Sequence, residues 1–170
     1  MQKKLTVLRY FSYGIEILIL YILQGTPNLI PEIYGGKPVL LICTALTIAA
    51  FEKEVPALFF GLGCGVLCDL AISNTIGYFA VVLTALCYLE AIIFNSVMVK
   101  NFLNTMLYAF CSCVLVIGLY FVFFFIFKGY TDIIYYFTNH YISRIIYTFV
   151  CVFPIYFLNM FIFTQSKEKE

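Results

Sequence analysis

The stretch Pro56–Ala80, PALFFGLGCGVLCDLAISNTIGYFA, decides the fold class of this protein. It is apolar over a length that can cross a bilayer, yet it carries Gly61, Gly65 and Asp69 at intervals of four residues. On a helix this spacing places the three residues along one stripe about 12 Å long. Glycines let another backbone approach closely, and a carboxylate beside them should face protein or water rather than lipid. The stretch therefore predicts a membrane helix with one packing face.

The same apolar character extends along the whole chain. Of its 170 residues, 64% are hydrophobic and 11% are charged, whereas a soluble domain is nearer half apolar and a quarter charged. Apolar runs of membrane-spanning length recur, and no polar stretch is long enough to fold separately. We therefore expect an all-α integral membrane protein in which residues 1–170 form a single polytopic domain. The net charge of +1 offers no electrostatic case for nucleic acid as a partner.

Six apolar segments are expected to span the membrane as a compact helix bundle. The second has about 14 residues, or ~21 Å as a helix, which is short for a hydrocarbon core of ~30 Å. A charged hairpin, Glu52–Lys53–Glu54, follows it. The expected spans are residues 10–23, 38–51, 55–72, 77–94, 102–127 and 145–163.

The distribution of basic residues distinguishes between six and five membrane spans. If all six segments cross, seven lysines and arginines lie on one side and three on the other; if the second does not cross, the split becomes five against five. Because cytoplasmic loops carry an excess of basic residues, the sequence favours six spans with both termini cytoplasmic. The side with seven holds Lys3, Lys4, Arg9, Lys53, Lys100, Lys167 and Lys169.

Three acids, Glu16, Asp69 and Glu90, lie well inside the apolar segments. One interpretation is a proton or cation relay, or a polar cluster that binds a substrate. Another is that each acid bonds a neighbouring helix, and a third is that Asp69 caps the polar break at Ser73–Asn74. No lysine or arginine lies at mid-membrane to pair with them, so some should be protonated or hydrated. The cost of burial favours structural or partner-facing roles over transport chemistry.

The glycine stripe has two interpretations, which are contact with a partner helix and close packing within the bundle itself. The seven cysteines form no CxxC pairs, so we expect small buried hydrophobes and no metal site. Motifs such as GxSxG, HExxH and the P-loop are absent from the sequence. We therefore expect no catalytic residues, no cofactor and no enzymatic activity.

The pattern Gly61-x-x-x-Gly65-x-x-x-Asp69-Leu70, followed by a short polar break and by Gly77 at the start of the next span, resembles the rod shape-determining protein MreD family. Length, span number and the short hydrophilic ends are also similar. Three further features match: the Lys37–Pro38 start of the second span, the Glu52–Lys53–Glu54 hairpin, and Pro154 late in the last span.

This resemblance implies a non-enzymatic scaffold of the bacterial cytoplasmic (inner) membrane. It implies a place in the cell-elongation (rod) complex, or elongasome, that supports peptidoglycan synthesis and cell shape. The implied partners are MreC, then RodA, a class B penicillin-binding protein and MreB, with a homodimer as a further association. The family fold is similar to the six-helix substrate-binding (S) subunits of energy-coupling-factor vitamin transporters, which hold a pocket open toward the outer face.

The resemblance also implies where partners would bind. The stripe and pocket around the third and fourth spans would hold the membrane-proximal segment of MreC, and the candidate contact or polar-pocket residues are Gly61, Gly65, Asp69, Gly77, Glu16 and Glu90. The alternative function is an S subunit of a vitamin transporter. Those subunits carry AxxxA on the first helix, and FSYGIEILILYIL here has no such pair. A proton-coupled channel would require the three acids to converge.

Overall fold

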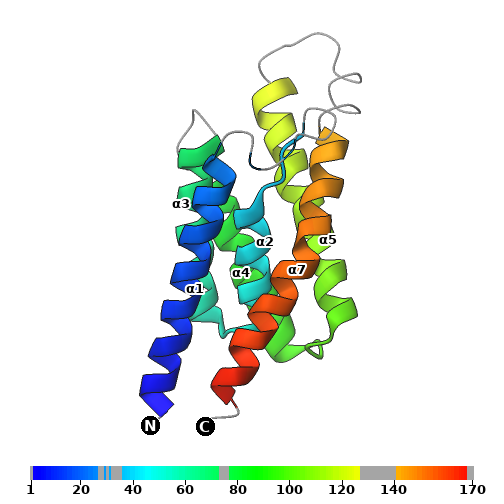
Figure 1. The fold of residues 1–170 in the computed structure, drawn as a ribbon. Coiled ribbons are helices and arrows are strands. Elements are labelled where there is room, and N and C mark those ends of the chain that lie inside the picture. The colour runs from blue at the N-terminus through cyan, green and yellow to red at the C-terminus, as the bar shows by residue number, and fades with distance from the viewer. Residues whose placement is uncertain are drawn as a thin grey trace.

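The computed structural model describes residues 2–26, 29, 31, 36–72, 77–126 and 141–167. Within these ranges the chain is a bundle of helices, and both termini lie at the same end of it (Figure 1). This confirms the prediction of an all-α fold. The elements are α1 (Gln2–Gly25), α2 (Leu40–Phe51), α3 (Glu54–Ile72), α4 (Tyr78–Ser96), α5 (Phe102–Phe121), the π-helical turn η1 (Val122–Ile126) and α7 (Ile142–Lys167).

Among the described residues, five helices are long and apolar enough to cross a membrane, which makes this a multi-pass membrane protein. The apolar windows in α1, α5 and α7 are Leu5–Gly25, Phe102–Phe124 and Ile142–Ser166, and α3 and α4 qualify over their whole lengths. The sixth apolar helix is α2, which is shorter. It corresponds to the segment whose crossing the sequence left open.

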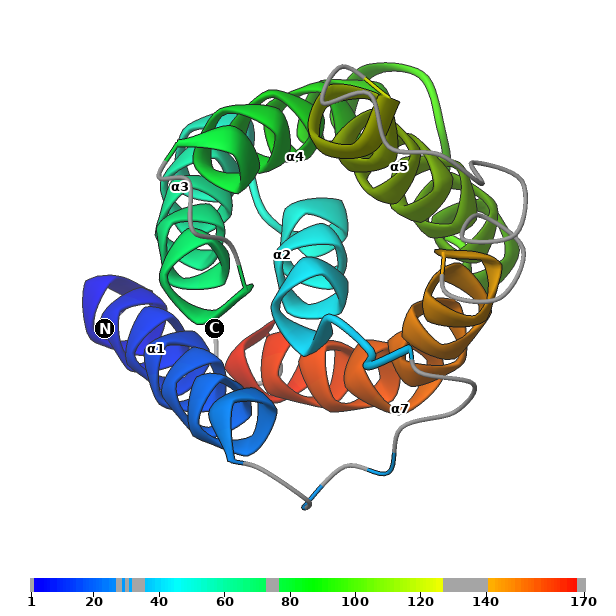
Figure 2. The same cartoon turned by 90° about the horizontal axis from the view of Figure 1, so that it is seen from above.

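The short helix α2 lies at the centre of the bundle, and the other helices surround it (Figure 2). All twelve of its residues, LLICTALTIAAF, are buried, and it contacts α1, α3, α4, α5 and α7. A helix that is apolar on every side belongs in an interior. Because lipid does not touch α2, its length of about 18 Å does not have to match the thickness of the hydrocarbon core.

Side chains from other helices accept hydrogen bonds from backbone N–H groups at the start of α2. The first N–H groups of a helix have no partner within it, and in a membrane interior each unpaired group is costly. The Val39 N–H donates to Thr148 Oγ1 of α7 at 3.1 Å, and the Leu41 N–H donates to Gln24 Oε1 of α1 at 3.3 Å. These bonds allow the start of α2 to lie inside the protein.

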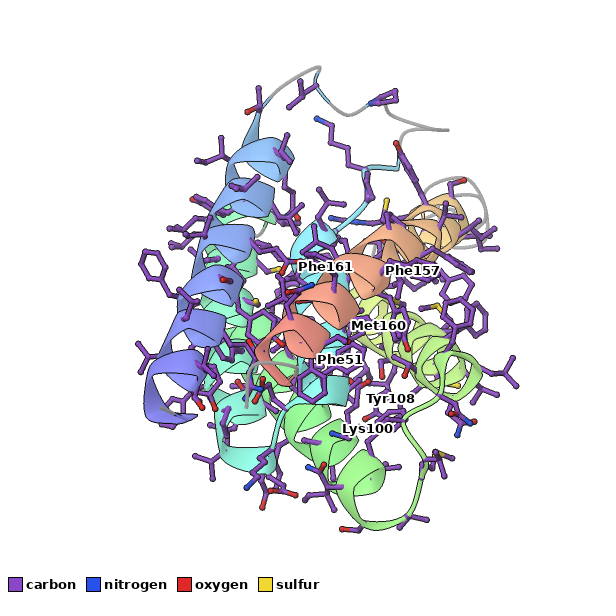
Figure 3. All side chains as sticks on the ribbon, turned by 60° about the horizontal axis from the view of Figure 1, so that its bottom comes forward. Phe51, Lys100, Tyr108, Phe157, Met160 and Phe161 are labelled. Carbon is purple, nitrogen blue, oxygen red and sulfur yellow. The ribbon has the colours of Figure 1, made fainter. Side chains whose placement is uncertain are left out.

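The other end of α2 is bound in the same way. Lys100 Nζ donates to the Phe51 carbonyl oxygen at 3.0 Å, and Asn95 Nδ2 donates to the Glu52 carbonyl oxygen at 3.3 Å. Figure 3 labels Phe51 and Lys100 near each other at this end of the molecule. The end of α4 and its connection to α5 therefore anchor the end of the central helix.

The helices begin and end close to the expected bounds, with two differences. The first span, expected at residues 10–23, is the longer α1, and the last, expected at 145–163, is the longer α7. The longer α1 includes Arg9, whose side chain has a buried acidic partner described below. The expected end of the fifth span, residue 127, lies outside the described residues.

Candidate functional site

The glycine stripe of α3 packs against α4. A Cβ atom on Gly65 would lie 2.5 Å from Ala80 Cα and 2.6 Å from the Phe79 carbonyl oxygen. A Cβ on Gly61 would lie 2.9 Å from Cys87 Cβ, whereas Gly63 has open space around it. Only a residue without a side chain permits so close an approach of two backbones. The alternative of close packing within the bundle is therefore what the structure shows for Gly61 and Gly65.

Asp69 lies at the end of this stripe and binds the start of α4. Its Oδ2 accepts from the Gly77 N–H at 2.9 Å and from the Ala80 N–H at 3.1 Å. Its Oδ1 accepts from the Phe79 N–H at 3.0 Å. A carboxylate here satisfies unpaired N–H groups and the positive end of the helix dipole. Asp69 thus caps a helix, as one interpretation held, although Ser73–Asn74 lie outside the described residues.

Gly77 completes this cap. It precedes the first residue of α4 with a φ of +114°, a conformation that side chains disfavour. Its N–H points to the Asp69 carboxylate. The sequence signal for Gly77, a glycine opening an apolar segment, therefore has a local backbone cause.

The structure places the residues predicted to bind MreC inside the bundle, and their contact with a partner stays a prediction. Gly61, Gly65 and Asp69 are buried between α3 and α4, and Gly77 bonds to Asp69. A partner helix could reach the stripe only by displacing α4. The four residues have an intramolecular role in this structure.

Glu90 is completely buried in α4. Its neighbours include Cys87, Tyr108 and Cys113, and neither carboxyl oxygen has a hydrogen-bond partner among the residues that the structure describes. The acid faces protein rather than lipid, as expected for a carboxyl group inside a membrane segment.

Glu16 joins three helices through Asn159. Asn159 Nδ2 of α7 donates to Glu16 Oε1 of α1 at 3.1 Å and to Thr47 Oγ1 of α2 at 2.9 Å. The side chains of all three residues are buried. Glu16 Oε2 has no hydrogen-bond partner within the described ranges. Sequence reasoning missed Asn159, whose only signal was a lone amide within the apolar run FLNMF.

The three intramembrane acids have different surroundings. Asp69 accepts hydrogen bonds from N–H groups at the start of α4. Glu16 accepts a hydrogen bond from Asn159. Glu90 lies beside Tyr108 of α5. Within the described residues, no hydrogen-bond partner is shared by two of the acids.

An ion pair that the sequence did not indicate ties α1 to the corner between α2 and α3. Arg9 Nε lies 2.7 Å from Glu52 Oε1, and Arg9 Nη2 donates to Glu52 Oε2 at 3.1 Å. The two side chains are only 12% and 3% exposed. Burial raises the pKa of the Glu52 carboxyl, and the Arg9 guanidinium opposes that rise. Glu52 was expected in a charged hairpin, but its side chain is buried because it pairs with the guanidinium of Arg9.

Most cysteines behave as the small buried hydrophobes that we predicted, with two exceptions. Cys111 is exposed on α5, and Cys151 of α7 is partly exposed. An apolar side chain can face lipid as readily as the protein core, so exposure of Cys111 carries no penalty there.

A groove opens on the outer surface between α1 and α7, and we call it the α1–α7 groove. Its volume is about 450 Å³. The walls are almost entirely apolar, and Glu16 is the one acid that lines them. Ser12 and Ile162 also line a second hollow of about 180 Å³, which continues toward the chain termini past Arg9 and Gln165. The candidate residue Glu16 thus lies on a groove that is open to the outside.

The chain matches no protein-family model, no curated protein and no solved structure.

Proposed function

We propose that this protein is a non-enzymatic scaffold of the bacterial cytoplasmic (inner) membrane, of the MreD type. In this role it binds MreC and supports peptidoglycan synthesis and cell shape within the elongation complex. The sequence support is the pattern of Gly61, Gly65, Asp69 and Gly77. A scaffold needs a rigid frame and a surface that accepts other membrane proteins.

The observation that carries the proposal is how the bundle uses its polar side chains. Asp69 holds α3 to α4, Asn159 holds α1, α2 and α7 together, and Arg9 holds α1 to Glu52. Polar groups bound to neighbouring helices give a frame rather than a conduction path. The α1–α7 groove lies on the outside of this frame.

The geometry favours a scaffold over a vitamin-binding subunit. Sites for small polar ligands combine an enclosed pocket with several converging polar groups. The α1–α7 groove has almost purely apolar walls, and the centre of the bundle is filled by α2 (Figure 2). Such a groove suits an apolar occupant.

The proposal includes six spans, with α2 crossing inside the bundle and both termini cytoplasmic. It is supported by the position of both termini at one end of the bundle (Figure 1) and by the excess of basic residues expected there. The first test is labelling with a membrane-impermeant maleimide. A cysteine at Val97, which is 82% exposed near the terminal end, should react in inside-out vesicles only, and one at Leu29 in intact cells only. The native cysteines all lie within helices, and the unsubstituted chain gives their background.

The test of function is purification of the tagged full-length chain from native membranes in mild detergent, with mass spectrometry of what copurifies. We expect MreC together with RodA or a class B penicillin-binding protein. The untagged chain, carried through the same steps, is the control. Recovery of a transmembrane coupling subunit with its ATPases in their place would overturn the scaffold proposal and indicate a transporter.

A further inference from the structure

We infer that the α1–α7 groove receives a transmembrane helix of another protein, and that this helix carries a hydrogen-bonding side chain that meets Glu16 inside the membrane. The inference rests on the proposed scaffold role and deepens it, because it names the surface and the chemistry of recognition. It does not depend on which protein the partner is.

The first observation is that one carboxyl oxygen of Glu16 lacks a hydrogen-bond partner among the described residues. Glu16 is 6% exposed and lines the groove. Its Oε1 accepts from Asn159, but Oε2 has no partner in the described part of the chain. Buried polar atoms are nearly always bonded, so one that is not calls for an explanation. Glu16 lines the groove, so a rotation of its buried carboxyl would bring Oε2 to a group seated there.

The second observation is depth. Glu16 lies near the middle of the 21-residue apolar segment Leu5–Gly25. At the rise of an α-helix this places it roughly 14–16 Å from either end of the segment. Lipid headgroups lie beyond that distance, and acyl chains offer no hydrogen-bonding group. Because neither part of the lipid supplies a partner at this depth, we assign that role to a protein segment within the hydrocarbon.

The third observation is shape. The groove and the hollow that continues it follow α1 from Leu5 to Leu20, which is about 22 Å of helix. The groove walls expose apolar side chains, among them Ile15 (43%), Ile19 (53%) and Leu158 (46%). Only 17% of the α1 window is buried, against 39% for α4, so α1 has the free surface that a further helix needs.

The chemistry of the recognised segment follows from these observations. It is an apolar helix with one polar side chain at mid-membrane depth, such as an amide or a hydroxyl, that bonds to the Glu16 carboxyl. Interhelical bonds of this kind contribute to helix association in membranes. The apolar walls would pack against the rest of the helix.

The experiment is site-specific photo-crosslinking in native membranes with the full-length chain. A photoreactive residue replaces Ile19 in the groove or, as the matched control, Val81, which is 69% exposed on α4. We expect the probe at Ile19 to give an adduct that mass spectrometry maps to a transmembrane segment with a polar residue near its middle. The probe at Val81 should not give this adduct.

Two substitutions then test the role of Glu16. Glu16→Leu should lower the yield of the adduct about fivefold to thirtyfold, the equivalent of one interhelical hydrogen bond. Glu16→Gln, which keeps a hydrogen-bonding group, should retain most of it. Tyr78→Phe serves as the folding control, because it removes a hydrogen bond to the Val116 carbonyl oxygen between α4 and α5 and lies outside the groove lining. Its adduct yield should match that of the unsubstituted chain.

Three results would overturn the inference: adducts with lipid alone, adducts with a second copy of this chain, or a segment without a polar residue. Equal yields for Glu16→Leu and Glu16→Gln would overturn it as well. Failure here and failure of the proposed function are distinguishable. Copurification of MreC without an adduct at Ile19 leaves the scaffold role and rejects the groove, whereas an adduct with a transporter coupling subunit supports the groove and rejects that role.

Discussion

The α3–α4 contact and the α1–α7 seam are two ways of joining helices within one bundle. Across the first, Gly65 brings the α3 backbone against Ala80, and the Asp69 carboxylate accepts three N–H groups of α4. Across the second, the side-chain amide of Asn159 donates a hydrogen bond to Glu16, and a groove of about 450 Å³ remains open. The α3–α4 contact is filled by its own backbone and side-chain atoms, whereas the α1–α7 seam leaves an open groove.

The helix α1 is held at separate points rather than along its length. Arg9 bonds to Glu52 at one end, Glu16 bonds to Asn159 in the middle, and Gln24 bonds to the N–H of Leu41 at the other end. These three side chains are seven and eight residues apart, so they share one face of the helix. Polar ties two turns apart secure α1 while leaving most of its surface apolar and exposed.

The comparison distinguishes a contact that makes this membrane protein rigid from a surface that can bind another molecule. Close backbone packing excludes lipid and partner alike, whereas widely spaced polar ties leave room between them. The following substitutions test this contrast. Stability is measured as the unfolding temperature in detergent. The signal is the reaction of a thiol dye with cysteines that are buried in the folded protein.

The largest loss is expected for Arg9→Met. It leaves the Glu52 carboxylate buried without its cation, and breaking a buried pair in this way costs about 3–5 kcal/mol. The double variant Arg9→Met/Glu52→Met should recover most of the loss, because neither charge is then left alone. If Arg9→Met alone unfolds within about 1 °C of the unsubstituted protein, the ion pair does not hold α1.

Asp69→Ala should be nearly as damaging. Three N–H groups, those of Gly77, Phe79 and Ala80, lose their acceptor. At about 1–3 kcal/mol for each buried unsatisfied group, a total near 3 kcal/mol is expected after partial relaxation. Asp69→Asn keeps one acceptor oxygen, so its unfolding temperature should fall between those of Asp69→Ala and the unsubstituted protein. Equal unfolding of all three proteins would contradict the cap.

Gly65→Ala tests the close approach of α3 and α4. The added methyl group would meet backbone atoms of Ala80 and Phe79, and overpacking of this kind costs about 1–3 kcal/mol. Gly63→Ala is the matched control, since open space surrounds that position and alanine is favoured over glycine in a helix by roughly 0.5–1 kcal/mol. The contrast fails if both variants shift the unfolding temperature in the same direction.

Asn159→Leu removes the tie between α1, α2 and α7. A loss of about 1–2 kcal/mol is expected, in keeping with interhelical hydrogen bonds in membranes. The loss should be smaller than that for Asp69→Ala, because the α1–α7 seam contributes less to the frame. A larger loss than for Asp69→Ala would reverse the order of the two regions.

The smallest effect is expected for Glu16→Gln. The amide oxygen can still accept from Asn159 Nδ2, so stability should change by less than about 0.6 kcal/mol. Glu16→Leu, which cannot accept this bond, provides the comparison within the same assay. A large loss for Glu16→Gln would mean that the carboxyl itself, rather than a hydrogen-bonding group, holds the seam.

The sequence by itself determined the helical membrane fold, because apolar composition and segment length act through the bilayer and need no knowledge of neighbours. It located α3 and α4 closely and singled out Gly61, Gly65 and Asp69, since glycine and carboxylate within an apolar run are costly unless they are used. It also allowed intramolecular packing as one role of the stripe. It could not choose between that role and a partner.

Only the tertiary structure decided which groups meet. Arg9 pairs with Glu52, 43 residues away, and Glu16 bonds to Asn159, 143 residues away. A single hydrogen bond or ion pair between distant residues leaves no periodic trace in the sequence, so these pairs could not be read from it. The central place of α2 was equally hidden, because an apolar helix suits lipid and protein interior alike. What separates the two is whether other side chains bind its polar ends, as Gln24, Thr148 and Lys100 do here.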